Sequence, residues 1–169
     1  MDKLVLSRNR FLAILLFWLV MMMGFFIFKY VTYATGNEVL LKSAPVDPRD
    51  IFRGDYVILR YEISSINLDS IQSYSDKYKF GDKVFVALDI EEGYGKAVGI
   101  SHDPIDNYQN IRGEVKHISK NILDVKYGIE SYFVQEGTGR EIENSREDMY
   151  VKVVLDKKGR GIVKEIRFE

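Results

Sequence analysis

Residues 11–28 form an unbroken apolar run, FLAILLFWLVMMMGFFIF, that contains no charged side chain. A bilayer core of roughly 30 Å is crossed by about 20 helical residues, so a run of this length predicts a transmembrane helix. We expect the anchor to extend over residues 11–34, with the long side chain of Lys29 reaching the interface. A buried core helix is disfavoured, because such a helix should show one polar face.

The charges at the N-terminal end of the run predict its orientation. The basic residues there are Lys3, Arg8 and Arg10, and Asp2 is the only acidic one. Basic flanks of a membrane span remain in the cytoplasm. We therefore expect residues 1–10 in the cytoplasm and residues 35–169 as an extracytoplasmic domain, in a protein that crosses the cell membrane once.

A cleaved signal peptide is the alternative explanation of the apolar run. The apolar region of a signal peptide usually has about 7–15 residues and ends at a small-x-small cleavage site. The run in this chain is longer, and Thr32-Tyr33-Ala34 is a weak match to such a site. The length favours an uncleaved anchor.

The charge balance of the chain limits its partners. The chain has 24 Lys and Arg and 25 Asp and Glu, and residues 1–30 hold four of the basic residues and one of the acidic ones. The remainder carries 20 basic and 24 acidic side chains, which argues against nucleic acid and against a strongly anionic substrate. No cysteine is present, so disulfides, thiol catalysis and thiolate metal ligands are excluded.

Short segments of alternating or β-branched residues follow the anchor, separated by turn residues. The predicted strands are residues 38–43, 56–63, 83–90, 96–100, 111–118, 122–127, 150–155 and 161–168. Residues 111–118 and 122–127 are expected to form a hairpin around Lys120-Asn121, and residues 150–155 and 161–168 another with the turn 157–160 (KKGR). About eight short strands at this spacing predict a mainly β domain, either a small barrel or a sandwich. Within residues 64–80, the spacing of Ile71, Tyr74 and Tyr78 predicts a short surface helix.

Residues 54–61 read GDYVILRY, in which a tight turn leads into a strand. Alternation places Leu59 and Tyr61 together on one face of this strand. The segment resembles the motif of the membrane-anchored bacterial GDYXXLXY proteins, and residues 45–56 (PVDPRDIFRGDY) are similar to the sequence that precedes it in that family.

A second block supports the resemblance. Residues 132–137 (YFVQEG), followed by Glu143, resemble a later block of the family, although Gln135 stands where the family has a proline. The family has no established activity. The resemblance implies that the chain is anchored in a membrane. It also implies that the chain accompanies a multi-spanning membrane protein, which would be its partner.

These two blocks contain the candidate site. The predicted binding residues are Asp50, Arg53, Asp55, Tyr56, Glu136 and Glu143, and the predicted structural residues of the motif are Gly54, Asp55, Tyr56, Leu59 and Tyr61. A cluster of charged side chains on one turn is suited to gripping a partner loop or peptide.

A membrane-anchored Ser–Lys peptidase is the main enzymatic alternative. Signal peptidases also carry a Gly-Asp-x-Val stretch that opens a strand after an N-terminal anchor, and residues 54–57 (GDYV) are similar to it. Their nucleophilic serine precedes the glycine by eight residues, where this chain has Val46, and Ser43 lies three residues too early. Because such chemistry requires the serine, the signal-peptidase-like hydrolase is disfavoured.

Metal binding is a further alternative. The carboxylates of Asp47, Asp50 and Asp55 are hard oxygen ligands, but their spacing differs from that of a calcium loop. His102 and His117 are isolated, and single histidines are more often structural. We predict no metal site.

Acidic residues in a glycine-containing loop offer a last enzymatic alternative. Glu136, Glu141 and Glu143 could supply the acid and base of a glycosidase. Such loops are usually solvated surfaces. The sequence therefore predicts no catalytic residue and no cofactor, and we expect a non-enzymatic accessory or interaction domain that works with another envelope or membrane protein.

Overall fold

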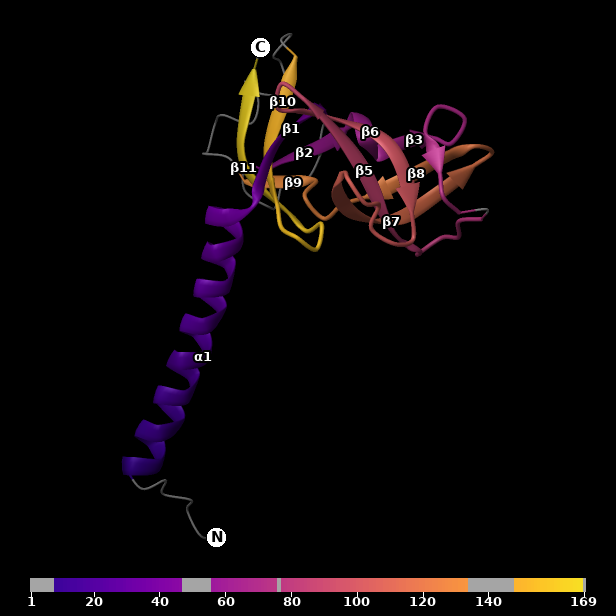
Figure 1. Cartoon of the computed structure of the whole chain (residues 1–169). Helices are drawn as coiled ribbons and strands as arrows, with labels where there is room; N and C mark the ends of the chain where they lie inside the picture. Colours follow the sequence, from indigo (N-terminus) through magenta and orange to yellow (C-terminus); the bar gives the residue numbers. More distant parts are fainter. Residues whose placement is uncertain (1–7, 47–55, 76, 134–147, 169) are drawn as a thin grey trace. The chain divides into compact units, whose positions relative to one another are not determined.

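The computed structural model describes residues 8–46, 56–75, 77–133 and 148–168. The chain divides into two compact units, Met1–Thr35 and Gly36–Glu169. The first unit consists of helix α1 and the second of a curled β-sheet (Figure 1).

Helix α1 extends over Arg8–Thr35, 28 residues that give a length of about 42 Å. Its described side chains are exposed, including those of the large apolar residues between Phe11 and Ile27. The segment Arg10–Ile27 is long and apolar enough to cross a membrane, and it is the one helix within the described residues that meets this test. The predicted apolar helix is confirmed.

The second unit is one sheet with a short 3₁₀ helix, η1, at Glu62–Ser64. The described strands are β1 (Asn37–Val46), β2 (Tyr56–Tyr61), β3 (Ser65–Asn67), β4 (Gln72–Ser73), β5 (Lys83–Glu91), β6 (Tyr94–Ser101), β7 (Gln109–Ser119), β8 (Ile122–Lys126), β9 (Ser131–Phe133), β10 (Met149–Leu155) and β11 (Gly161–Phe168). Along the sheet the order is β11-β10-β1-β6-β5-β7-β8-β3, with β2 paired to β1 and β9, and β4 paired to β6.

The mainly β fold preceded by one helix is confirmed, and the sheet curls into a half-barrel (Figure 1). The structure adds β3, β4 and β9 to the eight predicted strands. Each has only two or three residues. A segment this short has no recognisable alternation, because one period of a strand already takes two residues.

The core is formed by residues from many strands, often at alternating positions. In β5, Val84, Val86 and Leu88 are buried, as the alternation predicts. Ile90 on the same strand is exposed, because the pairing of β5 with β7 ends at Leu88. Further core residues are Val39, Leu41, Leu59, Tyr61, Ile100, Ile111, Val115, Leu123, Val151 and Val153.

The predicted helix within residues 64–80 is wrong. This region contains β3 and β4, and β4 pairs with β6 in parallel through Gln72 and Gly99. The backbone N–H of Tyr74 also donates to the carbonyl of Ile100, at 3.0 Å. These long-range bonds hold the segment extended, and they outweigh a helical spacing supported by only three residues.

Strand β1 pairs with three other strands of the sheet. It pairs antiparallel with β10 from Asn37 to Ser43 and with β2 from Ser43 to Val46. It also meets β6 in parallel at Leu40. The strand therefore connects the β10–β11 hairpin to both β2 and the rest of the sheet.

Candidate functional site

Strand β2 carries the described part of the motif. Leu59 and Tyr61 are buried in the core, on the shared face that alternation predicts for them. The Tyr61 hydroxyl donates to the carbonyl of Ile129 at 2.7 Å. Burial, together with the Glu130 carboxylate, raises the pKa of Tyr61 well above its usual value. Both residues serve the packing of the domain.

The other predicted site residues fall outside the described residues. They are Asp50, Arg53, Gly54 and Asp55 in the segment 47–55, and Glu136 and Glu143 in the segment 134–147. The backbone of Tyr56 is described as the first residue of β2.

The structure brings the attachment points of these two segments together. Residues 47–55 join β1 to β2, and residues 134–147 connect β9 to the start of β10. The four strands are neighbours in the order β10-β1-β2-β9, and Tyr56 pairs with Phe133. We call the strand ends at Val46, Tyr56, Phe133 and Met149 the motif edge. Two blocks that are far apart in the sequence therefore begin at the same edge of the sheet.

An exposed aromatic side chain marks the motif edge. Phe133 is 78% exposed, whereas the preceding Tyr132 packs against the core. Alternation explains the difference, because successive side chains of a strand point to opposite faces. Exposed aromatic side chains are typical of protein interfaces.

A hollow of about 540 Å³ lies over β1, β6 and β10. Its lining residues are Leu40, Lys42, Glu62, Glu91, Glu92, Tyr94, Gly95, Lys96 and Tyr150, and we call it the tyrosine hollow. The rings of Tyr94 and Tyr150 meet edge to face, with centroids 5.0 Å apart. A Cβ at Gly95 would lie 2.6 Å from Val39, so a larger residue would disturb the packing beneath the hollow.

An ion pair connects the tyrosine hollow to the second block. Lys42 donates to Asp148 at 2.8 Å, and Asp148 is the first described residue after the segment 134–147. This hydrogen bond raises the pKa of Lys42. The hollow combines charges of both signs with aromatic rings, a composition suited to a polypeptide partner.

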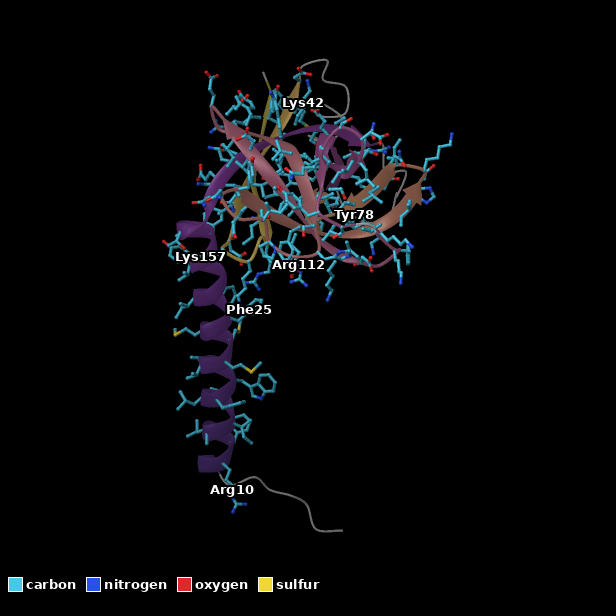
Figure 2. All side chains as sticks on the ribbon, turned by 45° about the vertical axis from the view of Figure 1, so that its right-hand side comes forward. Arg10, Phe25, Lys42, Tyr78, Arg112 and Lys157 are labelled. Atoms are coloured by element: carbon cyan, nitrogen blue, oxygen red, sulfur yellow. The ribbon has the colours of Figure 1, made fainter. Side chains whose placement is uncertain are left out.

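A second hollow, of about 430 Å³, is strongly basic. Its lining residues are Lys83, Arg112, Gly113, Glu114, Lys116, Lys126, Tyr127, Gly128, Arg160 and Gly161, and we call it the basic hollow. In Figure 2, Arg112 is labelled at the bottom of the β unit with Lys157, and Lys42 is labelled at the top. The sequence did not predict this site, because its cations come from three strands, β5, β7 and β8, and from the turn that contains Arg160.

One trio of side chains contains the residue types of a serine hydrolase. His102 Nδ1 lies 2.9 Å from the Ser75 hydroxyl, and Nε2 lies 3.2 Å from the Asp82 carboxylate. The Asp82 carboxylate also accepts the backbone N–H of Lys79 at 2.8 Å, which together with His102 lowers its pKa. None of the trio lines either hollow, and its hydrogen bonds connect the segments before β5 to His102, which follows β6.

The structure describes only some of the earlier catalytic and metal candidates. The Ser43 hydroxyl is buried and donates to the carbonyl of Arg60, at 3.1 Å. Within the described part of the chain, no three His, Asp or Glu side chains are grouped to hold a metal ion. Asp47, Asp50, Asp55, Glu136, Glu141 and Glu143 lie outside that part.

Comparison with known proteins gives one match. The family model described as GDYXXLXY protein matches residues 18–166, nearly the whole chain. No curated protein and no solved structure matches the chain.

Proposed function

Because the chain belongs to the GDYXXLXY protein family and carries one helix apolar enough to anchor in a membrane, we propose that it is a single-pass membrane protein whose β unit binds another membrane or envelope protein. The basic residues that precede the run support a cytoplasmic N-terminus and an extracytoplasmic β unit. A signal sequence would share the length and composition of the helix, and it is the competing explanation.

The observation that carries the proposal is the pairing of Tyr56 with Phe133 at the motif edge. This pairing brings the segments with the predicted contact residues to neighbouring strand ends. The ring of Phe133, the last residue of β9, is exposed at this edge. Exposed aromatic side chains frequently anchor protein interfaces.

Affinity capture tests this proposal. The tagged full-length protein is solubilised from membranes in mild detergent, and the proteins that copurify are quantified by mass spectrometry. We expect Phe133→Ser to lower the recovery of a specific copurifying protein by about tenfold or more, since aromatic anchors dominate interface energetics. The matched control is Phe80→Ser, because Phe80 is 75% exposed and lies outside the motif edge.

The recoveries with Phe133→Ser and Phe80→Ser show whether the partner binds at the motif edge. Loss of the same protein with Phe133→Ser but not with Phe80→Ser supports binding at the motif edge. Equal recovery with both variants contradicts it. Charge reversal at Asp50 and Arg53, with folding checked by circular dichroism, tests the predicted contact residues separately.

A hydrolase is the second candidate function, and the Ser75–His102–Asp82 trio is the observation that favours it. A serine activated by a base reacts with fluorophosphonates. The enzymatic proposal therefore requires that the full-length protein be labelled by such a probe and that Ser75→Ala remove the label. Ser65→Ala, which changes another exposed serine, is the control. Absence of labelling, or labelling that survives Ser75→Ala, argues against the hydrolase.

A further inference from the structure

The basic hollow concentrates positive charge on a domain whose overall charge is negative. Five of its lining residues are cationic and one, Glu114, is acidic. Glu114 is paired with Lys116 at 2.6 Å, and the Lys116 hydrogen bond lowers the pKa of Glu114.

Three of these cations have no described carboxylate within ion-pair distance. Within the described part of the chain, Lys83, Arg112 and Lys126 form no ion pair with a carboxylate. Arg160 is paired with Asp156 at 2.7 Å. Lys83 and Lys126 act on Glu114 from a greater distance, but the five cations outnumber this one carboxylate and give the hollow a local positive potential that the average charge of the domain does not reveal.

Two more cations extend the surface. Lys157 and Lys158 are exposed in the turn between β10 and β11. The turn is held against the hollow, because the backbone N–H of Arg112 donates to the carbonyl of Gly159 at 2.8 Å. We call the basic hollow and this turn together the basic surface.

The basic surface lies near the point where the chain enters the β unit. Asn37, the first residue of β1, pairs with Leu155 at the end of β10, directly before the basic turn. The Asn37 side chain also donates to Gln109 at 2.7 Å, three residues before Arg112. Asn37 follows Thr35, the last residue of α1, by two residues, a reach of at most about 7 Å.

The length of the helix limits how far this entry point can be from lipid. From Ile27 to Thr35 the helix rises about 12 Å. A headgroup layer takes roughly 5–7 Å of that rise. With the further reach of up to about 7 Å to Asn37, the entry point lies at most about 14 Å beyond the headgroups, which is less than two Debye lengths of about 8 Å at physiological salt.

We propose that the basic surface binds the headgroups of anionic phospholipids in the membrane that holds α1. Clusters of Lys and Arg beside a membrane span are attracted to anionic lipid headgroups. The contact would restrict the orientation of the β unit at the membrane and leave the motif edge for a protein partner. This inference rests on the membrane anchoring proposed above.

Lysine footprinting tests the proposal on the unmodified full-length protein. The protein is reconstituted in nanodiscs of phosphatidylcholine alone, or with roughly 30% phosphatidylglycerol, and acylated with an amine-reactive ester. Mass spectrometry gives the acylation rate of each lysine. We expect the rates at Lys126, Lys157 and Lys158 to fall about threefold or more in the anionic discs, and to recover at high salt, which screens the attraction.

Lys96 is the internal control, because it lines the tyrosine hollow and is paired with Glu91. Its rate should be equal in both lipids. The double substitution Arg112→Gln and Lys126→Gln should also weaken the protection of Lys157 and Lys158 in anionic discs. Inorganic phosphate added to neutral discs shows whether a free anion gives the same protection.

Each outcome decides one point. Equal rates in the two lipids, in protein that has entered the discs, overturn the lipid contact and leave the anchor proposal intact. Failure of the chain to enter either kind of disc overturns both proposals. Equal protection by inorganic phosphate in neutral discs would identify a free-anion site and contradict the membrane contact.

Discussion

At the scale of single residues, the hydrogen bonds of two buried tyrosines explain why the last position of the motif is a tyrosine. The Tyr61 hydroxyl donates to the carbonyl of Ile129, and the Tyr127 hydroxyl donates to that of Ile63, at 2.5 Å. Residues 61–63 and residues 127–129 are therefore joined by two hydrogen bonds, one donated from each segment. Burial raises the pKa of Tyr127 as well, with a further contribution from Glu130. The last position of the motif thus requires a hydroxyl as well as a ring.

Removing the Tyr61 hydroxyl should therefore destabilise the domain. Tyr61→Phe keeps the ring but leaves the carbonyl of Ile129 buried without this donor, a loss of about 1–3 kcal/mol. Urea unfolding of the full-length protein in mild detergent, followed by circular dichroism, measures the change. Tyr108→Phe, at a residue 44% exposed, is the control and should have little effect. Equal stability of the two variants would contradict a bracing role for Tyr61.

At the scale of elements, the β10–β11 turn depends on the carboxylate of Asp156, which was not among the predicted turn residues. Asp156 accepts the backbone N–H groups of Lys158 and Arg160, each at 2.8 Å. Gly159 has a φ of +75°, in the left-handed region that glycine adopts readily. The predicted KKGR turn is confirmed, and the residue immediately before it organises its backbone.

The stability of this turn should depend on pH. Burial of Asp156 alone opposes ionisation, but its hydrogen bonds from Arg160 and Lys158 outweigh burial and lower its pKa. A lowered pKa in the folded state stabilises the protein above the unfolded pKa of about 4, and this contribution is lost as the pH falls through the folded value. Asp156→Asn should therefore lower the urea midpoint at pH 7, with a difference that shrinks toward roughly pH 3. A difference that is constant over this range would exclude ionisation as the cause.

Elements differ in how well the sequence predicts them. The hairpins of β7–β8 and β10–β11 were predicted, because alternation and turn residues are local signals. The segment containing β4 was assigned incorrectly, because its conformation depends on pairing with β6. β3 and β9 were missed for the same reason, since each is stabilised mainly by its partner strand.

At the scale of the whole molecule, the chain combines an apolar helix with a separate compact β unit. Large apolar side chains are exposed along α1, and water is an unfavourable environment for so much apolar surface. The proposed membrane anchor would give this surface an apolar environment. The motif edge and the basic surface then have distinct proposed roles, one toward a protein and the other toward lipid.

Protease accessibility tests the proposed topology. Protease added to spheroplasts with an intact cytoplasmic membrane should digest the β unit and leave a fragment that contains α1, because basic residues keep the N-terminus inside. Val20→Arg, which puts a charge in the middle of the apolar segment, should lower the amount of protein retained in the membrane. A β unit that is cleaved only after the membrane is permeabilised would place it in the cytoplasm and refute the topology. Recovery of a soluble chain that begins after residue 34 would indicate a cleaved signal peptide.

The sequence by itself determined the apolar helix, most long strands, their hairpins and the family, because these depend on periodicity, turn residues and a contiguous motif. It also identified both blocks of the candidate site. Only the tertiary structure brought those blocks to neighbouring strands through Tyr56 and Phe133, and gathered Lys83, Arg112 and Arg160 around one hollow. Such proximity arises from strand order and sheet curvature, which join residues far apart in the chain and leave no local pattern.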